Sequence, residues 1–182
     1  MAFTRKFYTA DTHFGHAGML TFGGRPFAST DEMDEFIIKA WNETVGPDDI
    51  VYHLGDFGYG DGERTRSIFS RLNGRKRLIL GNHDVDRKGS VKKDLADLGW
   101  DQPPVSYAET TDEGERVILF HYAMRTWSAS CHGSYHFFGH SHGKLPAYGR
   151  SRDVGVDCPD TGFAPRTFQQ LIAEIKEAEV VS

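Results

Sequence analysis

The chain has 182 residues, the size of one ordinary domain, and a single domain over residues 1–182 is expected. A hydrophobic share of 38%, a charged share of 26% and a net charge of −5 exclude a disordered, collagen-like or coiled-coil protein. No run of about 18 apolar residues is present, so no membrane span is predicted. The first residues lack the apolar segment of a signal peptide, which predicts a cytoplasmic location.

The net charge limits the class of partner, and the number and spacing of the cysteines limit their role. Proteins that bind long nucleic acid need a basic stripe, so the acidic balance argues against that partner and leaves a small nucleotide substrate open. Cys131 and Cys158 are too few for a disulfide framework and lack zinc-ribbon spacing, so both are predicted to be reduced thiols.

The first half of the chain alternates β-rich runs with amphipathic runs. Strands are predicted over residues 6–10, 50–54 and 76–80, and helices over residues 63–72 and 90–98, the last one capped by Ser90.

The clearest helix follows a Gly-rich loop over residues 15–27. Ser29 and Glu32 form a capping-box pattern at its start, and Gly46-Pro47 ends it. Apolar residues at helical spacing predict one buried face: Met33, Phe36, Ile37, Ala40 and Trp41.

The second half is richer in strands. Residues 105–109 and 116–120 flank a polar turn and are predicted to form a hairpin. Two more strands are expected over residues 134–138 and 152–156, and a closing helix over residues 167–178. This order predicts a layered α/β or α+β domain.

Five of the predicted strands end in polar clusters. Ligand sites gather at the carboxyl ends of strands in α/β sheets, so clusters that are far apart in the sequence are expected to meet. They are Asp11-x-His13, Asp56, Asn82-His83, His121 and His140-x-His142.

This set of side chains predicts a metal site. Imidazole and carboxylate without cysteine suit Mn, Fe, Co, Ni or Zn, and so many imidazoles argue against a pure Ca or Mg site. The donors outnumber those needed by one tetrahedral ion, which favours two ions that share a carboxylate. Gly55, Gly81 and Gly139 each precede a donor and are expected to allow a close approach of the backbone.

The ordered blocks resemble the calcineurin-like metallophosphoesterase superfamily. They are Asp11-x-His13, Gly55-Asp56, Gly81-Asn82-His83-Asp84, His121 and Gly139-His140-Ser141-His142, and they cover residues 11–142. Residues 11–16, followed by Arg25-Pro26-Phe27, are similar to a small single-domain subgroup that is common in bacteria and phages. The resemblance implies a two-sheet β-sandwich flanked by helices, with the site at the strand ends.

The resemblance also implies a role for each site residue. One ion would be held by Asp11, His13 and His142, the other by Asn82, His121 and His140, and both by Asp56. His83 would face the substrate phosphate and stabilise or protonate the leaving oxygen, and Asp84 would orient its imidazole. A hydroxide that bridges two divalent ions, with Mn²⁺ the first expectation and Fe, Zn, Ni or Co as alternatives, would attack phosphorus.

Residues around these motifs allow two interpretations each. His16 either contacts the substrate or caps its own loop, and Arg25 either clamps a phosphate or forms a surface ion pair. The segment 122–135 either faces the substrate or packs through Trp127. His53 is expected to pack behind the site.

The favoured function is hydrolysis of a phosphodiester of a nucleotide or another small molecule. The alternatives are a phosphomonoesterase, a DNA or RNA nuclease, and a non-catalytic interaction scaffold. The sequence leaves the oligomeric state open, with a homo-oligomer among the options.

Overall fold

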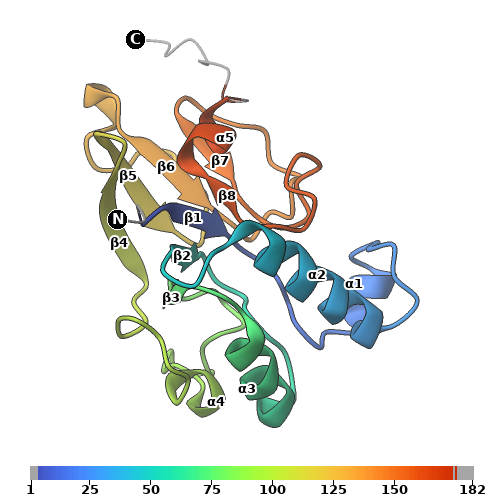
Figure 1. Ribbon diagram of the computed structural model, residues 1–182. Coiled ribbons are helices and arrows are strands. Elements are labelled where there is room, and N and C mark those ends of the chain that lie inside the picture. The colour runs from blue at the N-terminus through green and yellow to red at the C-terminus, as the bar shows by residue number, and fades with distance from the viewer. Residues whose placement is uncertain (1–3, 174, 176–182) are drawn as a thin grey trace.

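The computed structural model describes residues 4–173 and 175 and contains two four-stranded sheets (Figure 1). The first sheet has the order β3 (Arg75–Leu78), β2 (Ile50–His53), β1 (Lys6–Thr9) and β8 (Arg166–Thr167). The second has the order β4 (Tyr107–Asp112), β5 (Glu115–Phe120), β6 (Tyr135–Phe138) and β7 (Ser151–Asp153). The predicted two-sheet sandwich flanked by helices is confirmed.

Each sheet contains three parallel neighbours, β1 to β3 in the first and β5 to β7 in the second. The helices α2 (Thr30–Thr44) and α3 (Gly62–Arg71) connect the parallel strands of the first sheet (Figure 1). A parallel bridge between Ala10 and Gly155 joins the ends of β1 and β7. The carboxyl ends of the parallel strands in the two sheets therefore meet at one edge, which is where the polar clusters are predicted to lie together.

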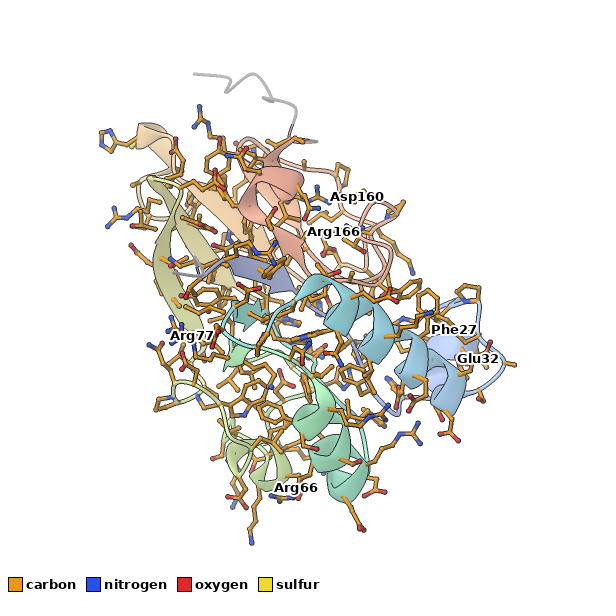
Figure 2. All side chains as sticks on the ribbon, in the orientation of Figure 1. Phe27, Glu32, Arg66, Arg77, Asp160 and Arg166 are labelled. Atoms are coloured by element: carbon orange, nitrogen blue, oxygen red, sulfur yellow. The ribbon has the colours of Figure 1, made fainter. Side chains whose placement is uncertain are left out.

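Alternate residues of the first sheet face two different cores. Phe7 and Val51 pack with the helices, whereas Tyr8 and Tyr52 pack against the second sheet. This alternation follows from the two-residue period of a strand. Side chains fill both layers (Figure 2). The first sheet is thus buried on both faces, which makes it a rigid base for the loops at its edge.

Helix α2 begins as predicted and buries Met33, Ile37 and Trp41 of the predicted face. The Ser29 hydroxyl accepts the Glu32 N–H at 3.1 Å, and the Glu32 carboxylate, seen at the free end of α2 in Figure 2, accepts the Ala28 N–H at 2.7 Å. The prediction that Phe36 lies in the core is wrong, since it is 47% exposed. Its ring instead contacts Phe27 from the Gly-rich loop, 5.3 Å between centroids.

The shorter elements differ most from the prediction. The Gly-rich loop contains a helix, α1 (Gly18–Thr21). Helix α4 (Lys93–Ala96) begins after Lys92, because Ser90 lies in a turn where its N–H donates to Asp86. Helix α5 (Phe168–Ile172) is capped by Thr167, and most of the rest of the predicted closing helix lies outside the described residues.

Cys131 and Cys158 are both free thiols, as predicted. Among the described residues, no helix has the length and the apolar character needed to cross a membrane.

Candidate metal centre

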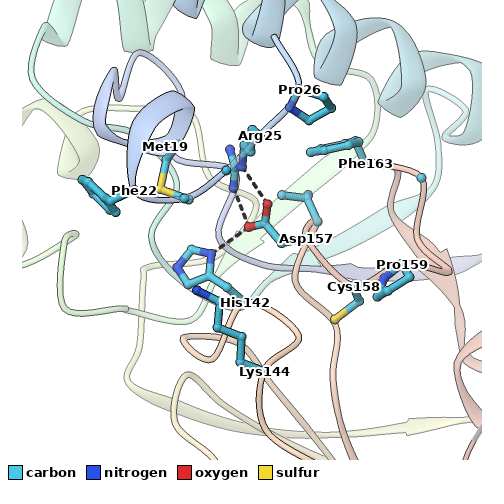
Figure 3. Close-up of a pocket in the computed structure, with 14 residues that line it drawn as sticks. Met19, Phe22, Arg25, Pro26, His142, Lys144, Asp157, Cys158, Pro159 and Phe163 are labelled. Atoms are coloured by element: carbon cyan, nitrogen blue, oxygen red, sulfur yellow. Dashed lines mark hydrogen bonds and ion pairs between the residues drawn. The ribbon is translucent and has the colours of Figure 1, made fainter.

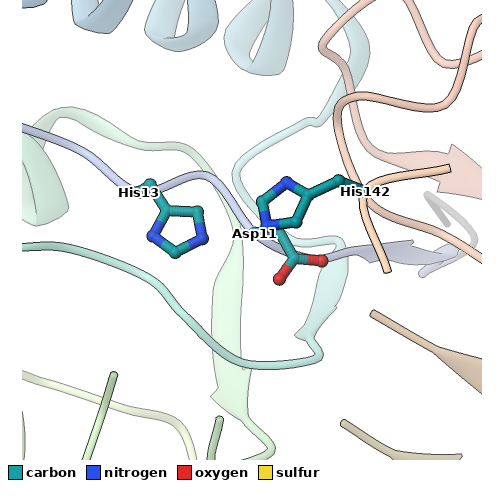
Figure 4. Close-up of side chains that lie close together, drawn as sticks. All are labelled: Asp11, His13 and His142. Atoms are coloured by element: carbon teal, nitrogen blue, oxygen red, sulfur yellow. The ribbon is translucent and has the colours of Figure 1, made fainter. Parts of the chain in front are cut away.

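The structure brings the predicted ligand residues together at the edge where the two sheets meet. In the part of the chain that the structure describes, three groups of candidate ligands form, and the ligand atoms within each group lie within 4.8 Å of one another. The groups are Asp11–His13–His142, His13–Asp56–His83 and Asp56–His121–His140; Figure 4 shows the first. We call Asp11, His13 and His142 the first half of the centre. We call Asn82, His121 and His140 the second half, and Asp56 lies beside both halves.

The first half contains buried ligand atoms that have no hydrogen-bond partner among the described residues. His13 is 2% exposed, and neither of its ring nitrogens has a hydrogen-bond partner among the described residues. Burial, and then the charge of Arg25, lower the pKa of His13 to about 2, so its ring is neutral and able to bind a metal. A buried polar group without a partner is costly. A cation beside Asp11 and His13 would remove this cost, and the donor set therefore fits a metal.

In the second half, three acceptor atoms lie close together: His121 Nε2, Asn82 Oδ1 and Oδ2 of the shared Asp56. The Nδ1–H of His121 donates to the Leu54 carbonyl at 2.7 Å, which leaves the lone pair on Nε2. That atom lies 3.1 Å from Asn82 Oδ1 and 3.6 Å from Asp56 Oδ2. Burial lowers the pKa of His121, which favours the neutral ring. Such a cluster of acceptors also fits a cation.

Strained backbone marks the same residues. Among the described residues, eight non-glycine residues have positive φ, and five of them belong to the ligand set. These five have φ between 49° and 66°: Asp11, His13, Asp56, His140 and His142. Left-handed backbone is disfavoured for residues with a Cβ and gathers at functional sites. The chain therefore accepts local strain in order to aim these donors.

The glycines before the donors allow close packing, as predicted. A Cβ on Gly139 would lie 2.6 Å from Asp11 Oδ2, and one on Gly55 would lie 2.6 Å from the Gly81 nitrogen. Any larger residue would push the loops of the site apart.

Asp84 has a different role from the one that the resemblance implies. Its buried carboxylate accepts the N–H groups of Asp56 at 2.7 Å, Gly81 at 2.8 Å and Phe57 at 3.1 Å. Among the described residues, its hydrogen bonds go to these backbone groups and none goes to the ring of His83, so the prediction that Asp84 orients that imidazole is wrong. Asp84 instead ties the loop after β2 to the loop after β3.

His83 lies at the junction of the site. Its backbone N–H donates to Asp56 Oδ1 at 2.8 Å, and its half-buried ring lies 5.2 Å from the ring of His13. Lys92 donates to its carbonyl oxygen at 2.6 Å and so holds the loop in place. The imidazole is therefore close to Asp56 while part of it stays open to solvent.

His16 lies beside the site. Its ring stacks on Tyr59 at 4.0 Å and lies 5.4 Å from the ring of His13. Burial lowers the pKa of His16, and its Nδ1 has no hydrogen-bond partner among the described residues. Of the two interpretations, the structure favours a position facing the site, and contact with substrate stays a prediction.

Arg25 is buried, and both of its interpretations are wrong. The guanidinium, 4% exposed, pairs with both oxygens of Asp157 at 2.8 Å (Figure 3). It also donates to the carbonyls of Asp11 and Thr12 at 2.6 and 2.7 Å. A further N–H faces the sulfur of Met33 at 3.5 Å. All five N–H groups are engaged, so Arg25 neither clamps a phosphate nor forms a surface ion pair.

Sequence patterns missed Asp157, which follows β7 without any motif. It accepts the Nδ1–H of His142 at 2.7 Å as well as the two bonds from Arg25. Burial alone would raise the pKa of Asp157, but the bonds from His142 and Arg25 lower it to about 2. Asp157 is thus a carboxylate that orients a candidate metal ligand.

A second supporting contact lies beneath the first half. Thr12, between Asp11 and His13, donates to the Phe57 carbonyl at 2.7 Å and accepts the Nε2–H of His53 at 2.9 Å. His53 is fully buried, which confirms that it packs behind the site.

The segment 122–135 divides between its two interpretations. The exposed Tyr122 places its ring 4.7 Å from that of His140, at the edge of the second half. Trp127 packs instead: its Nε1–H donates to the Ser134 carbonyl at 3.1 Å, and its ring lies 5.5 Å from His136.

Comparisons with curated proteins find partial relatives. The uncharacterized protein MJ1445 of Methanocaldococcus jannaschii is 42% identical over 83 residues, which are 44% of this chain and 47% of that protein. The gene 66 protein of Mycobacterium phage L5 is 40% identical over 85 residues, 44% of this chain and 40% of the phage protein. The chain spans less than half the length of these relatives. No family model matches the chain.

Comparison with solved structures shows the fold. A protein of unknown function from Aquifex aeolicus, AQ665, matches with a TM-score of 0.70 and 22% identity over 95% of this chain and all of that one. The neighbours also include Yfce, a phosphoesterase from E. coli, at a TM-score of 0.47 and 16% identity over 84% of this chain and 79% of that one. The match to AQ665 shows the fold alone.

Proposed function

We propose that this chain is a calcineurin-like metallophosphoesterase that uses two divalent cations to hydrolyse a phosphodiester of a nucleotide or another small molecule. The observation that carries the proposal is the meeting of seven donor side chains at one edge, with Asp56 within reach of both halves. A shared carboxylate between two sets of neutral imidazoles is typical of a two-metal site.

The chain supplies one ligand set for each cation. Asp11, His13 and His142 would hold the first, Asn82, His121 and His140 the second, and Asp56 both. When bound, divalent cations activate water and neutralise charge on phosphoryl oxygens. Among Mn, Fe, Co, Ni and Zn, we favour Mn²⁺, because the set mixes imidazole with carboxylate and amide oxygens.

The chain's own residues prepare the site for this chemistry. Burial keeps the imidazoles of His13 and His121 neutral, so they need not lose a proton before they bind a cation. Asp84 holds the backbone around Asp56 in position. His83, partly open to solvent beside Asp56, can give a proton to the leaving oxygen.

The preference for a diester rests on charge. A monoester dianion needs more positive charge around it than a diester monoanion does. Arg25, the guanidinium beside the first half, has no free N–H to offer such a dianion, which leaves the single ammonium of Lys144 on that side of the site. A phosphomonoesterase is therefore the second candidate, and the acidic balance places a nuclease acting on long strands behind it.

The experiment begins with protein stripped by a chelator and reconstituted with manganese. We expect two ions per chain, and we expect hydrolysis of bis(4-nitrophenyl) phosphate to be faster than hydrolysis of 4-nitrophenyl phosphate. Faster hydrolysis of the monoester would overturn the diester preference. Fewer than one ion per chain, with neither substrate hydrolysed, would overturn the enzyme and favour a scaffold.

A further inference from the structure

A cavity of about 320 Å³ opens beside the first half of the centre (Figure 3). We call it the His142 pocket, after the candidate metal ligand that forms part of its wall. Its lining includes Met19, Phe22, Pro26, His142, Lys144 and Phe163. The volume is at the lower end of the range for sites that bind small molecules, about 300–1,000 Å³. A group that enters the pocket would therefore lie next to a phosphate held at the centre.

Three polar residues of the wall, Arg25, Asp157 and His142, are already hydrogen-bonded to one another. The Arg25 guanidinium has all of its N–H groups engaged, and the Asp157 carboxylate is bound by Arg25 and His142. These groups hold one another rigidly and offer few free hydrogen bonds to a ligand. Recognition in this pocket must therefore come from its other walls.

Those other walls are largely apolar and partly aromatic. Phe22 is 72% exposed, yet its ring is held edge-on against His16 at 5.7 Å and 71°. Phe163 lines the same pocket, held by edge-on contacts with Phe27 and Phe36. Aromatic rings of this kind bind other flat rings by stacking or by edge contacts.

A second cation besides Arg25 lines the pocket. Lys144 lies two residues after His142, and none of the ion pairs among the described residues uses its ammonium group. An ammonium group binds an anionic oxygen as a point charge and does not depend on the shape of the organic group. The pocket thus combines a shape-selective apolar wall with a charge that binds any phosphate oxygen.

We propose that the His142 pocket binds the organic group of the substrate, that this group is a flat ring, and that Lys144 binds an oxygen of the adjoining phosphate. This inference rests on the proposed function and adds the substrate class: esters of an aryl alcohol or a nucleoside, and not of a small alkyl alcohol. In the aryl ester and in the nucleoside ester alike, the flat ring is the feature that the pocket would recognise.

The test measures the binding of two stable phosphonates to manganese-loaded protein by calorimetry, so that no turnover is needed. Phenylphosphonate and methylphosphonate carry the same anionic group and differ in the ring. We expect phenylphosphonate to bind about tenfold more tightly. Phe22→Ala should abolish this difference, and Lys144→Gln should weaken both ligands equally and preserve it. Tyr107→Ala, which removes an exposed ring on β4, is the matched control.

Equal affinities in the unaltered protein, or a preference that survives Phe22→Ala, would overturn the inference and leave the proposed function standing. Failure of both phosphonates to bind, with no hydrolysis of bis(4-nitrophenyl) phosphate, would overturn both. A further pair separates the two sources of the ring. Binding of adenosine 5′-monophosphate that depends on Phe22 and exceeds that of ribose 5-phosphate supports a nucleoside, and equal binding of that pair supports an aryl ester.

Discussion

The two halves of the candidate centre are supported in different ways. In the first half, Asp11 and His13 are buried, and His142 is held by the chain of contacts through Asp157 to Arg25. In the second half, His121 is buried against the Leu54 carbonyl, whereas Asn82 and His140 are exposed. One half thus has charged side chains packed behind it, and the other lies closer to solvent.

One fold can therefore build two metal sites that have similar ligands but differ in the hydrogen bonds that support those ligands. Ligands that are oriented by a further layer of hydrogen bonds bind metals more tightly than ligands without one. The exposed half leaves room for a substrate oxygen. We therefore expect the first half to retain its metal during dialysis longer than the second half does.

The largest effect is expected at the residue that the two halves share. Asp56→Asn removes the only charged oxygen common to both sets, so activity should fall to background and the metal content from two ions to one or fewer. Elemental analysis together with a diester assay measures both quantities. Asp48→Asn, an exposed carboxylate before β2, is the control. Two ions and full activity in Asp56→Asn would remove the shared ligand from the description.

The next effect separates metal binding from chemistry. His83→Ala should retain both ions and lose about 10²–10⁴-fold in rate, the usual contribution of a general acid. His132→Ala, which removes an exposed histidine outside the ligand set, should retain the full rate. An unchanged rate for His83→Ala would exclude it as the acid, and a lost ion would show that it is a ligand of the centre.

A change behind the first half should weaken that half alone. Asp157→Asn loses the charge that orients His142, and we expect about 10–100-fold weaker binding of one manganese ion with the other unchanged. Calorimetric titration of the metal-free protein resolves the two events. Asp160→Asn, which changes an exposed carboxylate on the same loop that pairs with Arg152, is the control. Equal weakening of both ions would contradict the difference between the halves.

The smallest effect concerns the stability of the metal-free protein in acid. Burial lowers the pKa of His53 from 6.5 to about 3. Between these values the unfolded chain binds a proton that the folded chain does not, so stability is full above pH 6.5 and falls as the pH decreases. At pH 5 this amounts to about 2 kcal/mol.

His53→Gln keeps a donor for Thr12 and removes this titration. We therefore expect the variant to lose about 2 kcal/mol less than the original chain when chemical unfolding is measured at pH 7.5 and again at pH 5. The same loss in both proteins would show that His53 does not titrate in this range.

Local patterns were enough to predict seven of the eight strands in the described residues, the two long helices and the residues that meet at the sheet edge, but not the two-residue strand β8. Strand and helix periods are short-range properties, and parallel strands bring their carboxyl ends together whatever the details of packing. The glycines before the donors could be read for the same reason, since the close approach occurs at the end of each strand.

Long-range packing decided the rest. Arg25 and Asp157 are 132 residues apart, and no local pattern shows that the guanidinium turns inward to meet that carboxylate. Asp84 follows His83 in the chain, yet its carboxylate binds backbone on another loop. Phe36 fits a helical stripe, but the buried face of α2 is set by the sheet beneath it. The sequence determined which side chains could form the centre, because the ends of strands carry them. Only the tertiary structure determined what holds them, because hydrogen-bond partners are chosen by proximity in space.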